Sequence, residues 1–263
     1  MKLKTGTKQW APCSENCIKG CQNDCLYCYA RKGAVRFKQK TVENWHIEEY
    51  NPKSAGHMRK HKGRIMFPTS HDLHMQTRDW WLPFLKGLLE TGNDVLIVSK
   101  PEVAAINTIL GSCADYRKQI EFRFTIGSCS EDVLRFWEPH APSFAERVTA
   151  LANAKYSEFR TSVSIEPLLD YDPSMLIELI RPFATETIWI GTMNHMHASD
   201  FRPEDAVMYH RMTEINSIQN IRAVYALFKH DPIIRWKDSI QKMLGISEEG
   251  RFVTREDMMR GME

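Results

Sequence analysis

Short apolar runs alternate along this chain with longer amphipathic stretches, a pattern typical of parallel strands connected by helices. Residues 95–98 are all aliphatic, which predicts a strand buried on both faces. Residues 120–126 alternate between apolar and polar side chains, as a strand with two different faces does. Further strands are predicted at 65–67, 160–165 and 187–190, with additional ones near 8–10 and at 223–227.

Amphipathic stretches predict helices between these strands, and two of them carry clear start signals. Ser143 and Glu146 have capping-box spacing, and Asp172 directly precedes Pro173. The predicted helices span 79–89, 101–110, 143–154, 172–180, 203–215 and 234–244. Strands and helices together give about six βα units, which predicts an α/β fold with a partial (β/α)6 TIM-like barrel. We expect one domain, with a core at 8–200 and a short C-terminal extension of helix and strand at 201–263.

Polar and chemically capable residues follow the predicted strands, where parallel barrels build their sites. They lie at 13–28, 69–72, 99–100, 125–129, at Glu166 and at 192–197. Because the carboxyl ends of parallel strands meet at one edge of a sheet, we expect these groups to lie close together. Such a series is unusual in a purely structural chain.

Composition narrows the class of protein. The chain has 263 residues, 43% of them hydrophobic, and a formal net charge of +2. This near-neutral charge argues against extended nucleic-acid binding. No apolar run reaches 18 residues, and the N-terminus lacks the apolar region of a secretion signal, so we expect a cytoplasmic protein without a membrane segment. In a reducing compartment, seven cysteines crowded toward the N-terminus favour metal binding over disulfides.

The most specific motif is the spacing C-x3-C-x2-C at Cys21, Cys25 and Cys28. Iron–sulfur cubanes are normally held by four thiolates, so a compact loop of three indicates a [4Fe–4S] cluster with one iron open to another ligand. A structural zinc knuckle is the alternative interpretation. Zinc requires four ligands, and Cys17, Cys13 or His46 could complete that set.

The cysteine loop after a first strand, in a chain of six βα units, resembles the radical S-adenosylmethionine (radical SAM) superfamily. Within it, the chain is most similar to the spore photoproduct lyase-like branch. The finer match rests on residues 20–31, 69–72, 98–100 and 137–143, together with Glu146 and Arg147. The resemblance covers roughly residues 10–200.

This resemblance implies a mechanism. Cys21, Cys25 and Cys28 would hold a [4Fe–4S] cluster whose fourth iron binds SAM. An electron from a flavodoxin- or ferredoxin-type donor would cleave SAM to methionine and a 5′-deoxyadenosyl radical, which takes a hydrogen atom from the substrate. The cofactors carry this chemistry, and the protein positions them and excludes water.

Individual roles follow from the same resemblance. Tyr27 matches an aromatic residue near the adenine, Ser70 a residue that helps to hold the SAM amino group, and Lys100 a lysine that pairs with the SAM carboxylate. Ser128, or else Thr125, matches the polar residue near the ribose.

One position departs from the branch. The repair lyase has a cysteine hydrogen donor two residues before the serine, where this chain has Pro68. This difference separates the chain from that DNA repair enzyme. Cys129, at a neighbouring strand end, is an alternative hydrogen donor.

Several strand-end residues are candidates for substrate contact or catalysis, each with a plain structural alternative. His71 and Asp72 could instead form a turn or helix cap, and Glu166 could form an ion pair inside the barrel. The loop residues Asn194, His195 and His197 could face the substrate or only build a loop. The basic run at 53–64 is either a solvated loop or an anion contact.

The leading hypothesis is a radical SAM enzyme that acts on a small molecule or modified nucleobase, as a C–C or C–N lyase. The most specific substrate considered is a 7-deazapurine such as queuine. Repair or modification of a base within DNA or RNA is the second hypothesis, and it would require a basic rim. A third hypothesis is a non-catalytic metal-binding module.

Overall fold

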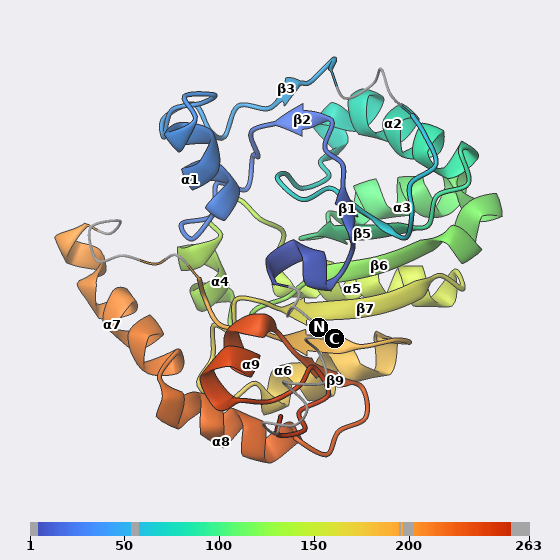
Figure 1. Ribbon diagram of the computed structural model, residues 1–263. Coiled ribbons are helices and arrows are strands. Elements are labelled where there is room, and N and C mark those ends of the chain that lie inside the picture. Colours follow the sequence, from blue (N-terminus) through green and yellow to red (C-terminus); the bar gives the residue numbers. More distant parts are fainter. Residues whose placement is uncertain (1–4, 54–57, 195, 197–201, 254–263) are drawn as a thin grey trace, which may run out of the picture.

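The computed structural model describes residues 5–53, 58–194, 196 and 202–253, and a seven-stranded parallel sheet forms its centre (Figure 1). In spatial order the strands are β1 (Cys13–Ser14), β4 (Ile65–Phe67), β5 (Val95–Ser99), β6 (Ile120–Thr125), β7 (Arg160–Ile165), β8 (Ile188–Ile190) and β9 (Ile234–Trp236). Every neighbouring pair is parallel. A separate antiparallel pair consists of β2 (Ile18–Lys19) and β3 (Glu49–Tyr50).

Helices alternate with the strands of the large sheet. They are α1 (Tyr29–Arg36), α2 (Arg78–Glu90), α3 (Val103–Ser112), α4 (Glu131–Trp137), α5 (Phe144–Tyr156), α6 (Ser174–Ile180), α7 (Ala206–Ile215), α8 (Ile218–Phe228) and α9 (Asp238–Leu244). Short 3₁₀ helices span Gly6–Gln9, Met75–Thr77, Ala114–Gln119, Arg181–Phe183 and Pro203–Asp205. This arrangement confirms the predicted α/β class and partial TIM-like barrel. Within the described ranges, no helix has the length and apolar character needed to span a bilayer.

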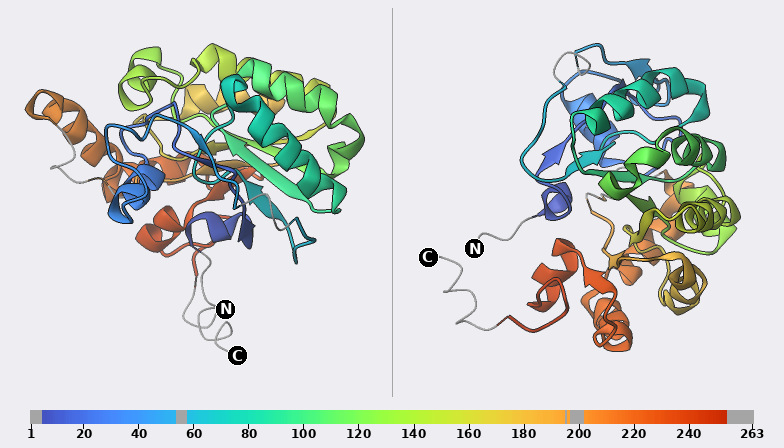
Figure 2. Two further views of the ribbon diagram at one scale, coloured as in Figure 1. Left: turned by 90° about the horizontal axis from the view of Figure 1, so that it is seen from above. Right: turned by 90° about the vertical axis from the view of Figure 1, so that its right-hand side faces the viewer.

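The two faces of the sheet differ in chemistry, and β6 shows the difference. Phe122 and Phe124 belong to the main hydrophobic core, which also includes buried side chains of α2, α3 and α5. Glu121 and Arg123, which alternate with these two residues along the strand, are also buried but point to the opposite face because strand side chains alternate. Figure 2 shows the helices that follow β4 to β7 (teal to gold) on one side of the sheet. This second face, which also includes the apolar cluster of Trp10, Ala11, Met66, Leu96 and Trp189, therefore turns toward the interior of the partial barrel.

Arg123 fills much of this interior. Its guanidinium carbon lies 4.9 Å from the Trp10 ring centre and 5.0 Å from the Trp189 ring centre. Nη2 donates to Glu121 Oε1 at 2.9 Å, and Nε donates to Ser162 Oγ at 2.9 Å. The buried charge is therefore paired, hydrogen-bonded and stacked, as a desolvated guanidinium must be.

Hydrogen bonds from the first 3₁₀ helix connect the N-terminal segment to β9 and α9, at the far edge of the sheet from β1. Gly6 N donates to Asp238 Oδ1 at 3.1 Å, and Lys237 Nζ donates to the Gly6 carbonyl at 3.0 Å. Gln9 Nε2 donates to the Trp236 carbonyl at 3.3 Å. These contacts bridge the side of the barrel that the strands leave open.

Three sequence-based assignments were wrong. Residues 8–10 do not form the first strand, because Trp10 N and Ala11 N both donate to the Thr7 carbonyl in a tight turn, and β1 begins at Cys13. Residues 223–227 belong to helix α8 instead of a strand. The apolar residues of the wider segment (Ile218, Ile221, Val224, Tyr225, Phe228) recur with helical spacing, and Ser217 Oγ caps the helix by accepting from Asn220 N.

The predicted helix at 234–244 is a strand followed by a helix. Ile234 and Trp236 are buried while Arg235 between them is half-buried, which is a strand pattern over three residues. The segment after residue 200 thus contributes the seventh strand of the sheet.

The difference in burial between two helical leucines predicts how much each contributes to the free energy of unfolding. Leu85 on α2 is fully buried in the core, whereas Leu227 on α8 is 58% exposed. We expect Leu85→Ala to lower the free energy of unfolding by about 2–5 kcal/mol, because it removes buried methyl groups and leaves a cavity. Leu227→Ala should change it by less than about 0.5 kcal/mol. Urea denaturation followed by circular dichroism measures both, and equal effects would contradict the assigned packing.

Candidate functional site

At the start of the cysteine loop, the backbone of Gly20 and Cys21 lies against the backbone of residues 45–47. Cys21 N donates to the Trp45 carbonyl at 3.0 Å. Gly20 has φ of +92°, and a Cβ there would lie 2.3 Å from the Ile47 carbonyl oxygen. Only glycine meets both conditions without strain. Residues 45–47 therefore lie directly against the start of the loop and fix its path.

The end of the loop is fixed by helix α1. Cys28 is its N-cap, and Cys28 Sγ accepts from Arg31 N at 3.4 Å. The Arg31 guanidinium folds back, with Nη1 2.8 Å from Asp24 Oδ1 and Nη2 donating to the Leu26 carbonyl at 3.0 Å. Because a helix N-terminus and a cation both favour negative charge, these contacts lower the pKa of Cys28, although burial has the larger, opposite effect.

All three loop cysteines are free thiols in a largely buried environment. Burial raises the pKa of Cys25 to about 12, with the positive charge of Lys100 acting in the opposite direction. Burial likewise raises the pKa of Cys21 and of Cys28. Without a metal these groups are therefore neutral thiols at pH 7. A bound cation would displace their protons, so metal binding by this loop would release protons.

Asp72 connects the cysteine loop to the sheet. Its Oδ1 accepts from Ser99 Oγ at 2.8 Å and from Lys100 N at 2.6 Å. Its Oδ2 accepts from Asn23 Nδ2 at 2.8 Å and lies 3.8 Å from both Cys21 Sγ and Lys100 Nζ. Burial would raise the pKa of this carboxyl, but the charges of Lys100 and His74 and the hydrogen bonds outweigh it and hold the pKa at about 2.

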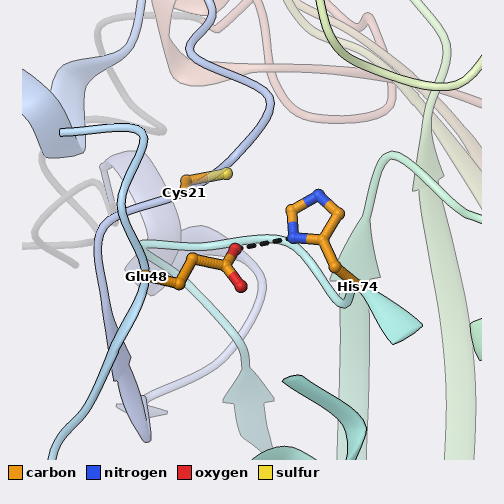
Figure 3. A group of neighbouring side chains, drawn as sticks. All are labelled: Cys21, Glu48 and His74. Carbon is orange, nitrogen blue, oxygen red and sulfur yellow. Dashed lines mark hydrogen bonds and ion pairs between the residues drawn. The ribbon is translucent and has the colours of Figure 1, made fainter. Parts of the chain in front are cut away.

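A second buried pair, Glu48 and His74, supports the loop from behind (Figure 3). His74 Nδ1 lies 2.6 Å from Glu48 Oε1, and His74 Nε2 lies 3.0 Å from Asn23 Oδ1. Since Asn23 Nδ2 donates to a carboxylate, Asn23 Oδ1 must accept, and both ring nitrogens of His74 donate. Burial works against this imidazolium, but Glu48 raises the pKa of His74 above its ordinary value.

The same pair could in principle hold a metal ion together with Cys21, because one ligand atom of each lies within 4.8 Å of the others. Two observations argue against that use. His74 has no lone pair to offer when both of its nitrogens donate. Glu48 is already saturated, accepting from Gln22 N, Gln22 Nε2, Thr77 Oγ1 and His74. The group is therefore a hydrogen-bonded support for the loop.

A third buried pair lies beneath Tyr27. The Tyr27 hydroxyl donates to Glu138, which forms an ion pair with Arg147. Arg147 Nη1 also donates to the Thr125 carbonyl at 3.2 Å, and Arg147 Nε donates to the Pro142 carbonyl at 2.8 Å. Tyr27 is thus linked to the end of β6, and its ring centre lies 5.5 Å from Lys100 Nζ.

A cavity of about 570 Å³ lies above the carboxyl ends of the strands, and it brings most of the predicted site residues together. From the predicted set, its lining includes Cys21, Cys25, Tyr27, Cys28, Ser70, His71, Asp72, Lys100, Thr125, Glu166 and Asn194. Its volume lies in the usual range for sites that bind small molecules. The arrangement can hold a metal group at the cysteine end and an organic ligand beside it.

The other end of the cavity has its own charged pair, Glu166 and Lys237. Lys237 Nζ lies 3.4 Å from Glu166 Oε2 and 4.0 Å from the Trp10 ring centre. Burial raises the pKa of Glu166 and lowers that of Lys237, while each opposes the effect of burial on the other. Gly191 lies so close that a Cβ there would meet the Lys237 side chain at 2.8 Å. Glu166 therefore forms an ion pair inside the barrel and also lines the cavity.

Other predicted residues lie elsewhere. Ser128 is fully buried outside the cavity, where its Oγ donates to Asp170 Oδ1 and accepts from Ser130 N, both at 2.9 Å. Cys129 is half-buried and does not line the cavity. His195 and His197 lie outside the described residues. Ser128 and Thr125 were the two candidates for the polar residue near the ribose, and of these Thr125 lines the cavity.

His71 lines the cavity as a neutral ring. Its Nδ1 lies 2.8 Å from the Asp72 carbonyl and must donate to it, while burial lowers the pKa of the ring. The opposite nitrogen, Nε2, is consequently an acceptor, and it is buried with no partner within the described part of the chain. The ring also packs edge-on against Phe67 at 6.0 Å.

Sequence reasoning missed two residues of the site. Lys237 fell within the predicted helix at 234–244 and was not recognised as a site residue. The alternating burial of Ile234 and Trp236 indicates a strand, and Lys237 directly follows its end. Asn16 holds the loop before His71: its Oδ1 accepts from Thr69 N at 2.7 Å and from Ser70 N at 2.9 Å. No local pattern signals Asn16, because its partners lie more than 50 residues away.

Comparisons with known proteins agree with this architecture. No protein-family profile matches the chain, and no curated protein matches it in sequence. Among solved structures, spore photoproduct lyase complexed with dinucleoside spore photoproduct is similar in fold, with a TM-score of 0.51 and 15% identity. A cysteine-to-alanine variant with the same dinucleoside and a tyrosine-to-phenylalanine variant give TM-scores of 0.50, at 15% and 13% identity. Each match covers 81% of this chain and 64% of the lyase chain, and shows a shared fold.

The lowered pKa of Asp72 predicts a stability change in acid. Since the carboxyl has a pKa of about 2 in the folded metal-free protein and an ordinary value of 3.8 when unfolded, its contribution is complete above about pH 4. It is lost as the pH falls toward 2, and amounts to about 2 kcal/mol. Wild type and Asp72→Asn should therefore differ most at pH 5 and converge near pH 2 in urea denaturation. A difference independent of pH would contradict the assigned ion pair.

Proposed function

We propose that this protein is a radical SAM enzyme that acts on a small molecule or a modified nucleobase, as a C–C or C–N lyase. The observation that carries the proposal is that three thiols spaced C-x3-C-x2-C line one cavity together with strand-end residues. The likeness in fold to spore photoproduct lyase supports it. Bound together, a [4Fe–4S] cluster and SAM supply a one-electron cleavage that yields a 5′-deoxyadenosyl radical.

The residues present fit such a cluster. Cys21, Cys25 and Cys28 offer three thiols in a row, and their surroundings oppose ionisation unless a cation is bound. Lys100 lies close enough to lower the pKa of Cys25, and its positive charge balances part of the negative charge of a thiolate-bound cluster. This donor set favours iron–sulfur over a structural zinc ion, because Cys13, Cys17 and His46, the residues considered as a fourth zinc ligand, do not line the cavity beside the three thiols.

SAM would lie beside the cysteine loop, between β4, β5 and β6. Lys100 Nζ stands 3.8 Å from Asp72, which is longer than a hydrogen bond, so the ammonium keeps donors for the carboxylate of a ligand. Ser70, held in place by Asn16, would bind the amino group. Tyr27 would pack near the adenine, and Thr125 would contact the ribose.

A substrate would occupy the opposite end of the cavity. Glu166, Lys237 and Asn194 offer an acceptor, a donor and an amide there, which suits the polar edge of a heterocycle. His71 Nε2 adds a neutral acceptor. A 7-deazapurine such as queuine is the specific substrate that we propose. The size of the cavity supports such a small ligand over the second hypothesis, a base that stays within DNA or RNA.

Substitution of a loop cysteine tests the cluster. We expect Cys25→Ala to lose the broad absorbance near 400 nm after anaerobic reconstitution, and to lose reductive SAM cleavage, because one iron ligand is gone. The matched control is Cys17→Ala, four residues before Cys21 and fully buried outside the cavity. It should keep both properties. If the protein were instead a non-catalytic metal-binding module, the wild type would bind metal but would not cleave SAM.

Substitution of Lys100 tests the seat of SAM. Lys100→Gln removes the charge opposite the ligand carboxylate, so we expect SAM affinity to fall by at least tenfold. Retained cluster absorbance would show that the fold survives, and Lys229→Gln, an exposed lysine beyond α8, serves as control. Equilibrium dialysis with labelled SAM on the reconstituted protein measures the effect. Unchanged affinity in Lys100→Gln would place the carboxylate elsewhere.

A further inference from the structure

Trp45 is buried without contributing to the apolar core. Its exposed fraction is 2%, yet it belongs to neither of the two clusters of buried apolar side chains in the described part of the chain. Instead it lines the cavity together with Cys21, Cys25 and Cys28. A large side chain that is buried outside the core and beside a row of thiols indicates a role other than packing.

The indole nitrogen of Trp45 needs a hydrogen-bond acceptor. Nε1 is buried and has no partner among the residues that the structure describes. An indole N–H can only donate, and a buried donor is costly to leave unpaired. His71 Nε2, the buried acceptor in the same cavity, does not serve, because it too has no partner there. A bound group that accepts hydrogen bonds would satisfy the indole.

A hydrogen-bonded turn holds Trp45 against the cysteine loop. Thr41 N donates to Asn44 Oδ1 at 2.7 Å, and Asn44 N donates to Thr41 Oγ1 at 3.3 Å. After the turn, Ile47 N donates to the Asn44 carbonyl at 3.1 Å. The Trp45 carbonyl accepts from Cys21 N at 3.0 Å. The backbone that bears the indole is therefore fixed directly beside the first cysteine of the loop.

We propose that the Trp45 indole N–H donates a hydrogen bond to a sulfur atom of the bound [4Fe–4S] cluster, an inorganic sulfide or the Cys21 thiolate. This inference rests on the proposed function. Cluster sulfurs accept hydrogen bonds and offer no donor, so they match the unpaired N–H of Trp45 and do not match His71 Nε2. Trp45 thereby becomes a fourth residue of this chain that contacts the cluster.

This hydrogen bond has a consequence for reduction of the cluster. Because the reduced cluster is the more negative form, a donor to its sulfur stabilises it and raises the reduction potential. The cysteine loop is largely buried, and burial disfavours added negative charge. The indole therefore makes the cluster easier to reduce than the same three thiolates would alone.

Redox titration of the reconstituted protein tests the inference. Trp45→Phe keeps an aromatic ring but removes the N–H, so the midpoint potential, followed by electron paramagnetic resonance, should shift to a more negative value. The matched control is Trp10→Phe, because Trp10 also lines the cavity with a buried, unpaired Nε1 but stacks on Lys237 at the opposite end. It should keep the wild-type potential. Equal potentials in wild type and Trp45→Phe would overturn the inference.

Isotope labelling gives a readout on the wild type itself. With nitrogen-15 in its indoles, and without SAM, the reconstituted wild type should show a nitrogen-15 coupling in pulsed electron paramagnetic resonance of the reduced cluster. Trp10→Phe should keep this coupling, and Trp45→Phe should lose it. A wild-type cluster without the coupling would overturn the proposed hydrogen bond even if Trp45→Phe failed to fold.

The same measurements separate the possible failures. Absence of any reducible cluster in the wild type would overturn the proposed function and this inference with it. A normal cluster without the nitrogen-15 coupling would overturn the role of Trp45 alone. Lowered SAM affinity in Trp45→Phe, with an unchanged midpoint potential, would assign the N–H to SAM and would also overturn the inference.

Discussion

The buried carboxylate of Asp72 is the contact on which the geometry of the site depends. A desolvated carboxylate is costly unless donors surround it. Here Ser99 and Lys100 contribute donors from the end of β5, and Asn23 contributes one from the cysteine loop. The same group thus satisfies its own charge and holds two distant parts of the chain at a fixed separation. The pairs at Glu48 and Glu138 repeat this arrangement on either side.

The two faces of the sheet explain how a cavity persists in a well-packed protein. The outer face is apolar and binds the helices, while the inner face has Glu121, Arg123 and Ser162. Together with the apolar cluster of Trp10, Met66, Leu96 and Trp189, these paired polar groups fill the lower interior. The space above them, at the strand ends, is lined by the charged pairs Asp72–Lys100 and Glu166–Lys237. A ligand there meets groups already oriented by their neighbours.

Much of this arrangement could be predicted from the sequence. Long patterns, such as the alternation in β6 and the aliphatic run in β5, identified the strands, and strand ends identified most of the cavity lining. Predictions of short elements were wrong, because three residues such as Ile234–Trp236 are compatible with a strand or with a turn of helix. Long-range hydrogen-bond partners could not be predicted either. Nothing in the sequence near Asn16 indicates that it contacts Thr69, and nothing near Asp72 indicates that it contacts Asn23. Such pairs depend on tertiary structure, which single-sequence patterns do not encode.

The bridge between Gly6 and Asp238 has a consequence for biosynthesis. The residues that close the open side of the barrel are separated by 232 positions, so Gly6 is synthesised well before Asp238. The cysteine loop therefore leaves the ribosome well before the wall of the cavity that includes Lys237. Contacts of such long range form late in folding. Until then the loop cysteines face an open trough, and a ligand of these thiols can reach them from that side.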